Sequence, residues 1–432
     1  MPVAAGVYLF VLYFIFFLIA HGLGFNIYGD KHWYVEAGSS LWNLDLSVEY
    51  ILFSPLHSLI LSLSDFIQGR VGEFFFAIID FFAKAAYCIF MGAYIFNFVT
   101  LLKKYKILSS RLSSLLCFVI ISNPYILRYS SGIYPEFYAL FGSLVIASRL
   151  LVMECLATPQ NASVHAHLSR CDGNNDHSSD SFFHGFHLLK EKYFLMLLFV
   201  LCLFRYSLVA IAIPYACIVY QSKIKSFFEN MIILTMHKSK FISPIFAISI
   251  RMLRKNSSSL NNISILWRIF QISVFLFIVF LLSLAFSWAF LPKAFLNYSF
   301  CDSFQALILL LGFREAFGSS SCFAGFDPSN FANILSRGGI GDLHLLNYTI
   351  SILFGFLNLV ITVLGLIGIC LVKSPRLKHF VLLSFASIAC ISFLLGIGHY
   401  RYLVPILPLI YLGLFVLLER INSKKQIFLF KY

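Results

Sequence analysis

Apolar runs longer than about 18 residues recur along this chain, and that is the length an α-helix needs to cross the hydrocarbon core of a bilayer. The sequence has 432 residues, of which 60% are hydrophobic and 12% are charged, whereas about 25% of residues are charged in soluble domains. A helix inside a bilayer satisfies its own backbone hydrogen bonds, so such runs fold as helices. We therefore predict an all-α polytopic transmembrane helical bundle, a single integral membrane domain over residues 1–432.

The apolar runs predict about ten spans. One run, Tyr193–Gln221, is interrupted by Arg205 and Pro214, so we interpret it as a hairpin of two short crossings. The predicted spans are Ala4–Phe25, Phe74–Leu102, Leu112–Leu127, Glu136–Met153, the hairpin within Tyr193–Gln221, Ile263–Leu291, Asn347–Val372, Leu377–Gly398 and Tyr402–Leu418.

Basic residues set the expected orientation, because Lys and Arg collect in cytoplasmic loops. With the hairpin, most of the 32 Lys and Arg residues fall on one side, which holds loops 154–192 and 222–262 and both termini. The opposite, outer side holds loops 26–72 and 292–346. The net charge of +13 then follows from membrane orientation, and we expect no nucleic-acid partner.

The first outer loop opens with a polar and aromatic segment that contains Asp30, His32, Trp33 and Tyr34. Spacing predicts a short helix that begins at Asp30 and lies along the membrane surface. The run Ile51–Leu63 is too short to span and contains Pro55, so we interpret it as an interfacial or re-entrant segment. A carboxylate at this depth can act as a general base. The alternatives are that Asp30 is a helix N-cap and Trp33 an interface anchor.

Charged residues also lie at the predicted outer ends of later spans. Glu136 is the first residue of a predicted span, where the helix dipole favours a carboxylate. The alternative is that Glu136 is a second acid in the same outer cleft as Asp30. Arg205 and Arg401 are each followed by a tyrosine. Arginine binds phosphate through two parallel hydrogen bonds, although snorkelling to the interface is the alternative.

In their order along the chain, these motifs resemble the GT-C superfamily of polyprenyl-phosphate-sugar-dependent glycosyltransferases. Within it they are most similar to the bacterial members related to protein O-mannosyltransferases and the lipid A aminoarabinose transferase. The motifs are Gly29-Asp30 with Trp33-Tyr34, Ser54-Pro55-Leu56, Asn123-Pro124, Tyr134 with Glu136, Phe204-Arg205-Tyr206, and His399-Tyr400-Arg401-Tyr402.

The resemblance implies two juxtamembrane helices in the first outer loop and inverting transfer from a polyprenyl-phosphate-linked sugar to a lipid, glycan or protein acceptor. It assigns a catalytic role to Asp30, as base, and to Glu136. It implies that Arg401, Arg205 and Tyr402 bind the donor phosphate and that His32, Trp33, Tyr34 and His399 line the pocket. No cofactor is certain, although a divalent metal bridging Asp30 and phosphate is compatible. The sequence departs from the family pattern in the Lys and His that follow Asp30.

Two other functions stay open. An O-antigen polymerase or ligase would place its essential residues in the late outer loop, at Arg314, Arg337 and His344. A transporter or flippase of lipid-linked sugars would use Asp80 and Lys84, which lie four residues apart inside a span and can pair. For the transferase, we expect a bacterial inner membrane with the site facing the periplasm.

Overall fold

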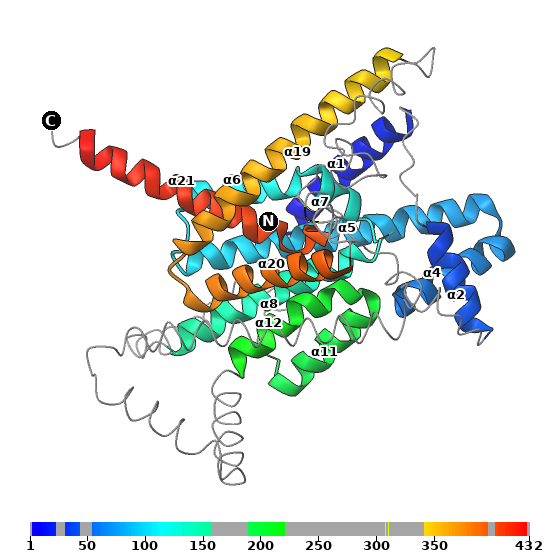
Figure 1. Cartoon of the computed structure of the whole chain (residues 1–432). Coiled ribbons are helices and arrows are strands. Elements are labelled where there is room, and N and C mark those ends of the chain that lie inside the picture. The colour runs from blue at the N-terminus through cyan, green and yellow to red at the C-terminus, as the bar shows by residue number, and fades with distance from the viewer. Residues whose placement is uncertain are drawn as a thin grey trace, which may run out of the picture.

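The computed structural model describes residues 2–22, 31–43, 54–132, 134–157, 189–220, 307, 310, 341–395 and 402–429 (Figure 1). Every regular element in these ranges is a helix, which confirms the all-α prediction for this part of the chain. The predicted span Ile263–Leu291 and loops 222–262 and 292–346, apart from residues 307, 310 and 341–346, lie outside the described residues, as does most of loop 154–192.

The helices follow the predicted spans closely where the apolar run is long. The elements are α1 (Pro2–Gly22), α2 (Lys31–Trp42), α4 (Pro55–Val71), α5 (Glu73–Lys104), α6 (Ser110–Ile121), α7 (Pro124–Tyr129), α8 (Glu136–Ala157), α11 (Glu191–Phe204), η2 (Tyr206–Leu208), α12 (Val209–Val219), α19 (Gly341–Cys370), α20 (Pro375–Leu395), η5 (Val404–Ile406) and α21 (Leu407–Leu429).

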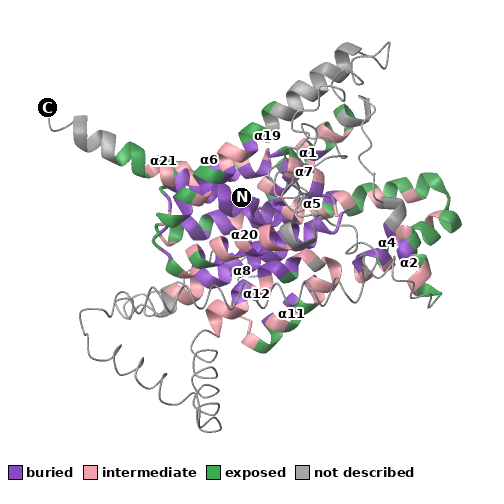
Figure 2. Cartoon of the chain, viewed as in Figure 1, coloured by how far each residue is buried: buried purple, intermediate pink, exposed green. Residues whose placement is uncertain are grey.

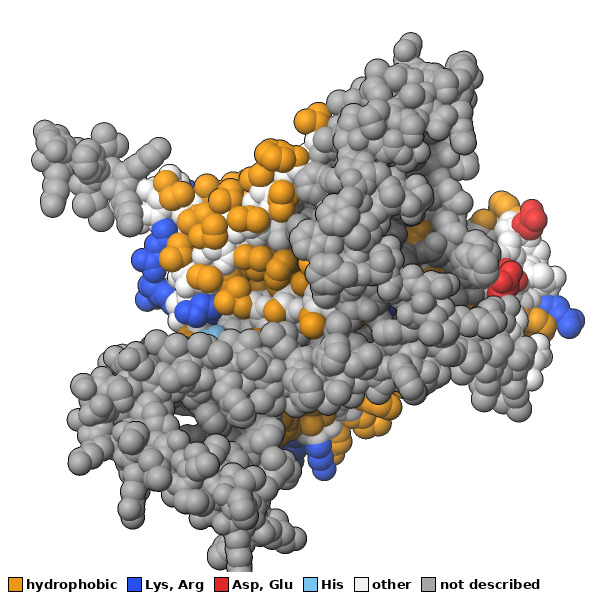
Figure 3. Space-filling model, viewed as in Figure 1, with side chains coloured by type: hydrophobic (Ala, Val, Ile, Leu, Met, Phe, Trp, Pro, Cys, Tyr) orange, Lys and Arg blue, Asp and Glu red, His pale blue; other side chains and the backbone are white. Residues whose placement is uncertain are grey.

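Four helices in the described ranges are long and apolar enough to cross a membrane. They contain the segments Pro2–Ile19, Glu73–Lys104, Glu136–Glu154 and Val404–Ser423. Shorter apolar helices cover Ser110–Ile121, Val209–Val219 and Phe356–Cys370. Figure 3 shows a broad field of hydrophobic side chains with Lys and Arg side chains along its left edge. These are features of a membrane protein, and the count of ten spans stays a prediction.

Helix α8 forms the centre of the bundle. In its apolar segment 89% of residues are buried inside the protein, against 17% in the corresponding segments of α1 and α5. Helices α5, α11 and α20 pack around it, and Figure 2 shows buried residues concentrated in the middle of the bundle, around α8 and α20. The start of α8, at Glu136, is therefore enclosed by protein.

The predicted single span Leu112–Leu127 is wrong as one helix, because the chain divides it into α6 and α7. Pro124 has no backbone N–H and cannot continue the helix that ends at Ile121. The Asn123 side chain instead caps α7, accepting hydrogen bonds from the backbone N–H groups of Tyr125 at 2.9 Å and Ile126 at 3.2 Å. Its amide also donates to the Tyr411 hydroxyl at 2.8 Å, which ties this break to α21.

The predicted reversal at Arg205 is present. Helix α11 ends at Phe204, and the single turn η2 leads into α12. The Tyr215 hydroxyl of α12 donates to Glu191 Oε1, at the start of α11, over 3.1 Å. The two helices therefore run in opposite directions.

Helices α2 and α4 pack against each other in the segment between α1 and α5. Helix α4 begins at Pro55, whose fixed φ suits the first helical turn, and continues to Val71, beyond the predicted Ile51–Leu63. The Ser39 and Ser62 hydroxyls lie 3.0 Å apart across the pair. The predicted helices thus exist, and their position relative to the membrane surface stays a prediction.

Glycines allow two helix pairs to approach closely. A methyl carbon added at Gly92 of α5 would lie 2.7 Å from the Gly6 Cα of α1 and 2.8 Å from the Ala5 carbonyl oxygen. Helices α19 and α21 are in similar contact through Gly368 and Gly413. Small residues at such crossings are typical of helices that associate within a membrane.

We predict that Gly92→Ala lowers the stability of the protein in detergent by about 1–3 kcal/mol, because the added methyl overpacks the α1–α5 crossing. Gly69→Ala in α4 is the matched control, since nothing lies within 4 Å of the added carbon. Unfolding of both purified variants in mixed micelles measures the difference. Equal stability of the two would contradict the close crossing.

Candidate functional site

A buried ion pair joins the start of α8 to the end of α11. Arg205 Nη2 lies 2.8 Å from Glu136 Oε1. The Glu136 side chain is 1% exposed and that of Arg205 is 12% exposed. Glu136 is the first residue of α8, where backbone N–H groups and the helix dipole favour a negative charge. Two residues that the sequence singled out separately are thus direct partners.

Two tyrosines complete the site around the same guanidinium. Arg205 Nη1 donates to the Tyr34 hydroxyl of α2 over 3.4 Å. The guanidinium carbon lies 5.7 Å from the centroid of the Tyr402 ring. That separation is within the range of a cation–π contact. Tyr402 lies two residues before the start of η5 in the sequence. Four predicted site residues, from four distant segments, therefore meet.

An aromatic wall beside this cluster was not predicted from the sequence. The His57 ring of α4 is 1% exposed and lies edge-to-face between Tyr34, at 5.1 Å, and Tyr138, at 5.9 Å. Tyr138 stacks on Phe204 with centroids 4.1 Å apart. The Tyr87 and Tyr138 hydroxyls lie 3.2 Å apart. The sequence feature that could have indicated this aromatic wall is the single histidine in the apolar segment after Pro55.

The turn before α8 aims Glu136 into the bundle. Gly132 has φ +74, a left-handed conformation that favours glycine. A methyl carbon there would also lie 2.5 Å from the Tyr87 ring. Arg128 Nη2 donates to the Tyr134 hydroxyl over 3.4 Å, and its guanidinium carbon lies 5.7 Å from the Tyr129 ring centroid. Arg128 thus braces this turn.

A second Arg–Glu pair closes the far end of the same helix pair. Arg149 Nη2 of α8 lies 2.7 Å from Glu191 Oε2 of α11. Arg149 Nη1 also donates to the Leu189 carbonyl over 2.7 Å. Arg149 lies about 20 Å from Glu136 along α8, at 1.5 Å per residue. This pair is therefore a structural counterpart well separated from the candidate site.

The pair inside α5 was predicted correctly. Lys84 forms an ion pair with Asp80 four residues earlier, and the Lys84 ammonium lies 5.9 Å from the Phe17 ring centroid. The Lys84 side chain is 12% exposed and that of Asp80 is 39% exposed. The pairing neutralises both charges within an apolar helix.

Several predicted site residues lie outside the described residues. These are Asp30, His399 and Arg401, together with Arg314 and Arg337 of the late loop. His32 and Trp33 belong to α2 and His344 to α19. Among the residues that were described, no group of three or more His, Cys, Asp and Glu side chains could hold a metal ion.

The geometry limits what Glu136 and Arg205 can do chemically. Glu136 already partners Arg205, and the pair together is close to neutral. A buried, paired carboxylate is poorly placed to take a proton from a substrate. The guanidinium has five N–H donors, so Arg205 can orient neighbouring groups while holding Glu136. The arrangement favours a positioning role for both residues.

Comparisons with protein-family models, with curated proteins and with solved structures found no match to this chain.

We predict that the Glu136–Arg205 pair behaves as a coupled unit in stability. Arg205→Met alone leaves a buried, unpaired carboxylate, which costs about 3–5 kcal/mol. The double variant Glu136→Gln/Arg205→Met removes both charges and is expected to recover much of that loss. Free energies of unfolding in mixed micelles measure the cycle. Strictly additive single and double variants would show that the two residues do not interact.

Proposed function

We propose that this protein is an integral membrane glycosyltransferase that moves a sugar from a polyprenyl-phosphate donor to an acceptor. The observation that supports it most is the convergence of Tyr34, Glu136 and Tyr402 on the guanidinium of Arg205. Each belongs to a separate motif of the GT-C resemblance. Their meeting at one buried contact supports a shared site.

The two residues proposed to do the chemistry directly adjoin this cluster in sequence. Asp30 directly precedes α2 in the sequence, four residues before Tyr34. Arg401 directly precedes Tyr402, and neighbouring Cα atoms lie about 3.8 Å apart. The contacts of Tyr34 and Tyr402 with Arg205 support the proposal that Asp30 and Arg401 act at the same site.

In the proposed reaction, the acceptor hydroxyl oxygen attacks the anomeric carbon of the donor sugar. Asp30 takes the hydroxyl proton as the new C–O bond forms. The bond between the anomeric carbon and the phosphate oxygen breaks, and the polyprenyl phosphate leaves with the electron pair. Arg401 meets the charge that develops on the phosphate, and attack opposite the leaving group inverts the anomeric centre.

The Glu136–Arg205 pair positions these groups, with Tyr402 beside the donor phosphate and His32, Trp33, Tyr34 and His399 around the sugar and acceptor. The donor is lipid-linked, so its tail lies among apolar helices. Charge distribution favours a site on the face opposite the basic loops, which is the periplasmic face in the bacterial inner membrane that we propose. A divalent metal between Asp30 and phosphate is compatible with this scheme and is tested by adding a chelator.

We predict that membranes containing Asp30→Asn transfer sugar from a radiolabelled polyprenyl-phosphate-sugar pool roughly 10²- to 10⁴-fold more slowly than wild type, as expected for loss of a general base. Lipid-linked sugar should accumulate. Expression is matched by immunoblot. Undiminished transfer by Asp30→Asn would contradict the assignment of the base.

The two Arg–Glu pairs supply a matched control for the positioning role in this assay. Arg205→Lys keeps the charge but loses the planar fork that holds Glu136 and Tyr34 together. Arg149→Lys makes the same change at the far end of α8. Transfer should fall with Arg205→Lys and stay near wild type with Arg149→Lys. Loss of transfer on Arg337→Gln, with Asp30→Asn active, would favour a polymerase or ligase instead.

A further inference from the structure

A basic cleft lies at the end of the bundle opposite the candidate site. It has a volume of about 500 Å³ and is enclosed by the α5–α6 turn, the α19–α20 turn and the middle of α21. Four cationic side chains line it, from Lys103, Lys106, Lys373 and Arg420, against the single carboxylate of Glu419. The net positive charge comes from three separate segments.

Both walls of the cleft are fixed by backbone structure. On one side, Lys106 has φ 53, and the Ile107 N–H donates to the Leu102 carbonyl over 3.0 Å, which closes α5 in a Schellman motif. On the other side, the Ser374 hydroxyl bonds Glu154 of α8 and accepts from the Leu377 N–H over 3.3 Å. Lys106 and Lys373 thus lie on ordered turns, and Lys103 and Arg420 lie on α5 and α21.

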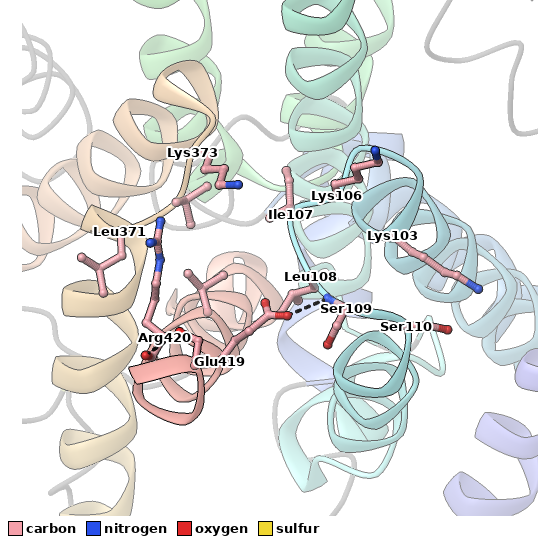
Figure 4. Close-up of a pocket in the computed structure, with 13 residues that line it drawn as sticks. Lys103, Lys106, Ile107, Leu108, Ser109, Ser110, Leu371, Lys373, Glu419 and Arg420 are labelled. Carbon is pink, nitrogen blue, oxygen red and sulfur yellow. Dashed lines mark hydrogen bonds between the residues drawn. The ribbon is translucent and has the colours of Figure 1, made fainter. Parts of the chain in front are cut away.

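The carboxylate in the cleft is already engaged. Glu419 Oε1 accepts a hydrogen bond from the Ser109 backbone N–H over 3.1 Å, which joins α21 to the start of α6. In Figure 4, Lys373 extends toward the space between the walls, and Arg420 rises along the α21 side. Lys103 and Lys106 stand on the opposite wall with their ammonium groups directed outward, at the rim.

Apolar side chains border these charges. Leu371, which lines the cleft, is 40% exposed, and Leu418 and Ile421 flank Glu419 and Arg420 on α21 at 41% and 45%. Leu115 on α6 is 50% exposed. Figure 3 shows, on one face of the molecule, a hydrophobic field that ends at Lys and Arg side chains. A ligand with a phosphate and attached hydrocarbon chains fits both parts.

We propose that this cleft binds the phosphate headgroup of an anionic membrane phospholipid. Basic pockets between transmembrane helices on the cytoplasmic side suit such headgroups, and the predicted orientation puts this end there. Lys and Arg residues commonly flank the cytoplasmic ends of membrane spans, and this alone would explain exposed cations on a flat surface. A cleft lined by four cationic side chains, with Lys373 extending into it, goes beyond that pattern. Glu154, near the cleft, lies about 27 Å along α8 from Glu136, so this site is separate from the proposed active site.

The test is retention of phosphatidylglycerol by the purified full chain in detergent, read by native mass spectrometry, with phosphatidylcholine of the same acyl chains as reference. Wild type should retain phosphatidylglycerol preferentially. Lys373→Gln/Arg420→Gln should lower the apparent affinity roughly 10- to 30-fold, as expected for two cations at a membrane surface. Lys373→Gln alone should give a smaller loss and serves as a second variant.

Lys104→Gln/Arg111→Gln is the matched control. It removes the same two charges from exposed residues at this end of α5 and α6 that do not line the cleft. The proposal predicts near wild-type retention. Equal loss in both double variants, or equal retention of the two lipids by wild type, would overturn it. Displacement of the lipid by an excess of inorganic phosphate would overturn the lipid assignment in favour of a soluble anion.

Discussion

The buried contact between Glu136 and Arg205 is the interaction on which the rest of the candidate site depends. Removing a carboxylate from water costs several kcal/mol, and a partner charge at hydrogen-bond distance offsets that cost. Arg205 Nη2 provides it at 2.8 Å. The same guanidinium contacts Tyr34 of α2 and Tyr402 before η5. Helix α2 and the segment before η5 are therefore both in contact with one side chain at the reversal between α11 and α12.

The remainder of α8 gives this contact a rigid support. Arg149 and Glu191 pair at the other end of the same two helices, so ion pairs close both ends of an otherwise apolar contact. Helices within a bilayer gain little from the hydrophobic effect on associating; polar pairs and close packing at glycines such as Gly92 supply the specificity. Helix α8 then separates the proposed periplasmic site from the basic cleft at the opposite end.

The sequence predicts the long helices well, because an apolar run of span length has few alternatives. Phe74–Leu102 was expected, and α5 covers Glu73–Lys104. The break at Pro124 was missed because Pro124 lies inside an apolar run of span length, and such a run by itself predicts one continuous helix. Glu136 and Arg205 were each identified as charges at helix ends, yet their pairing depends on the relative position of α8 and α11, which no local pattern encodes. His57 was missed because one histidine in an apolar segment carries no distinguishing spacing.

The most direct measurement of the central claim is photo-crosslinking with a benzophenone-bearing polyprenyl-phosphate sugar in membranes, followed by peptide mapping. The donor is proposed to lie beside the Arg205 cluster, so labelled peptides should contain residues of α2 and the segment that includes Tyr402. Competition by unlabelled donor should remove the label. Specific labelling confined to residues 292–346, with none near Tyr34 or Tyr402, would contradict the account.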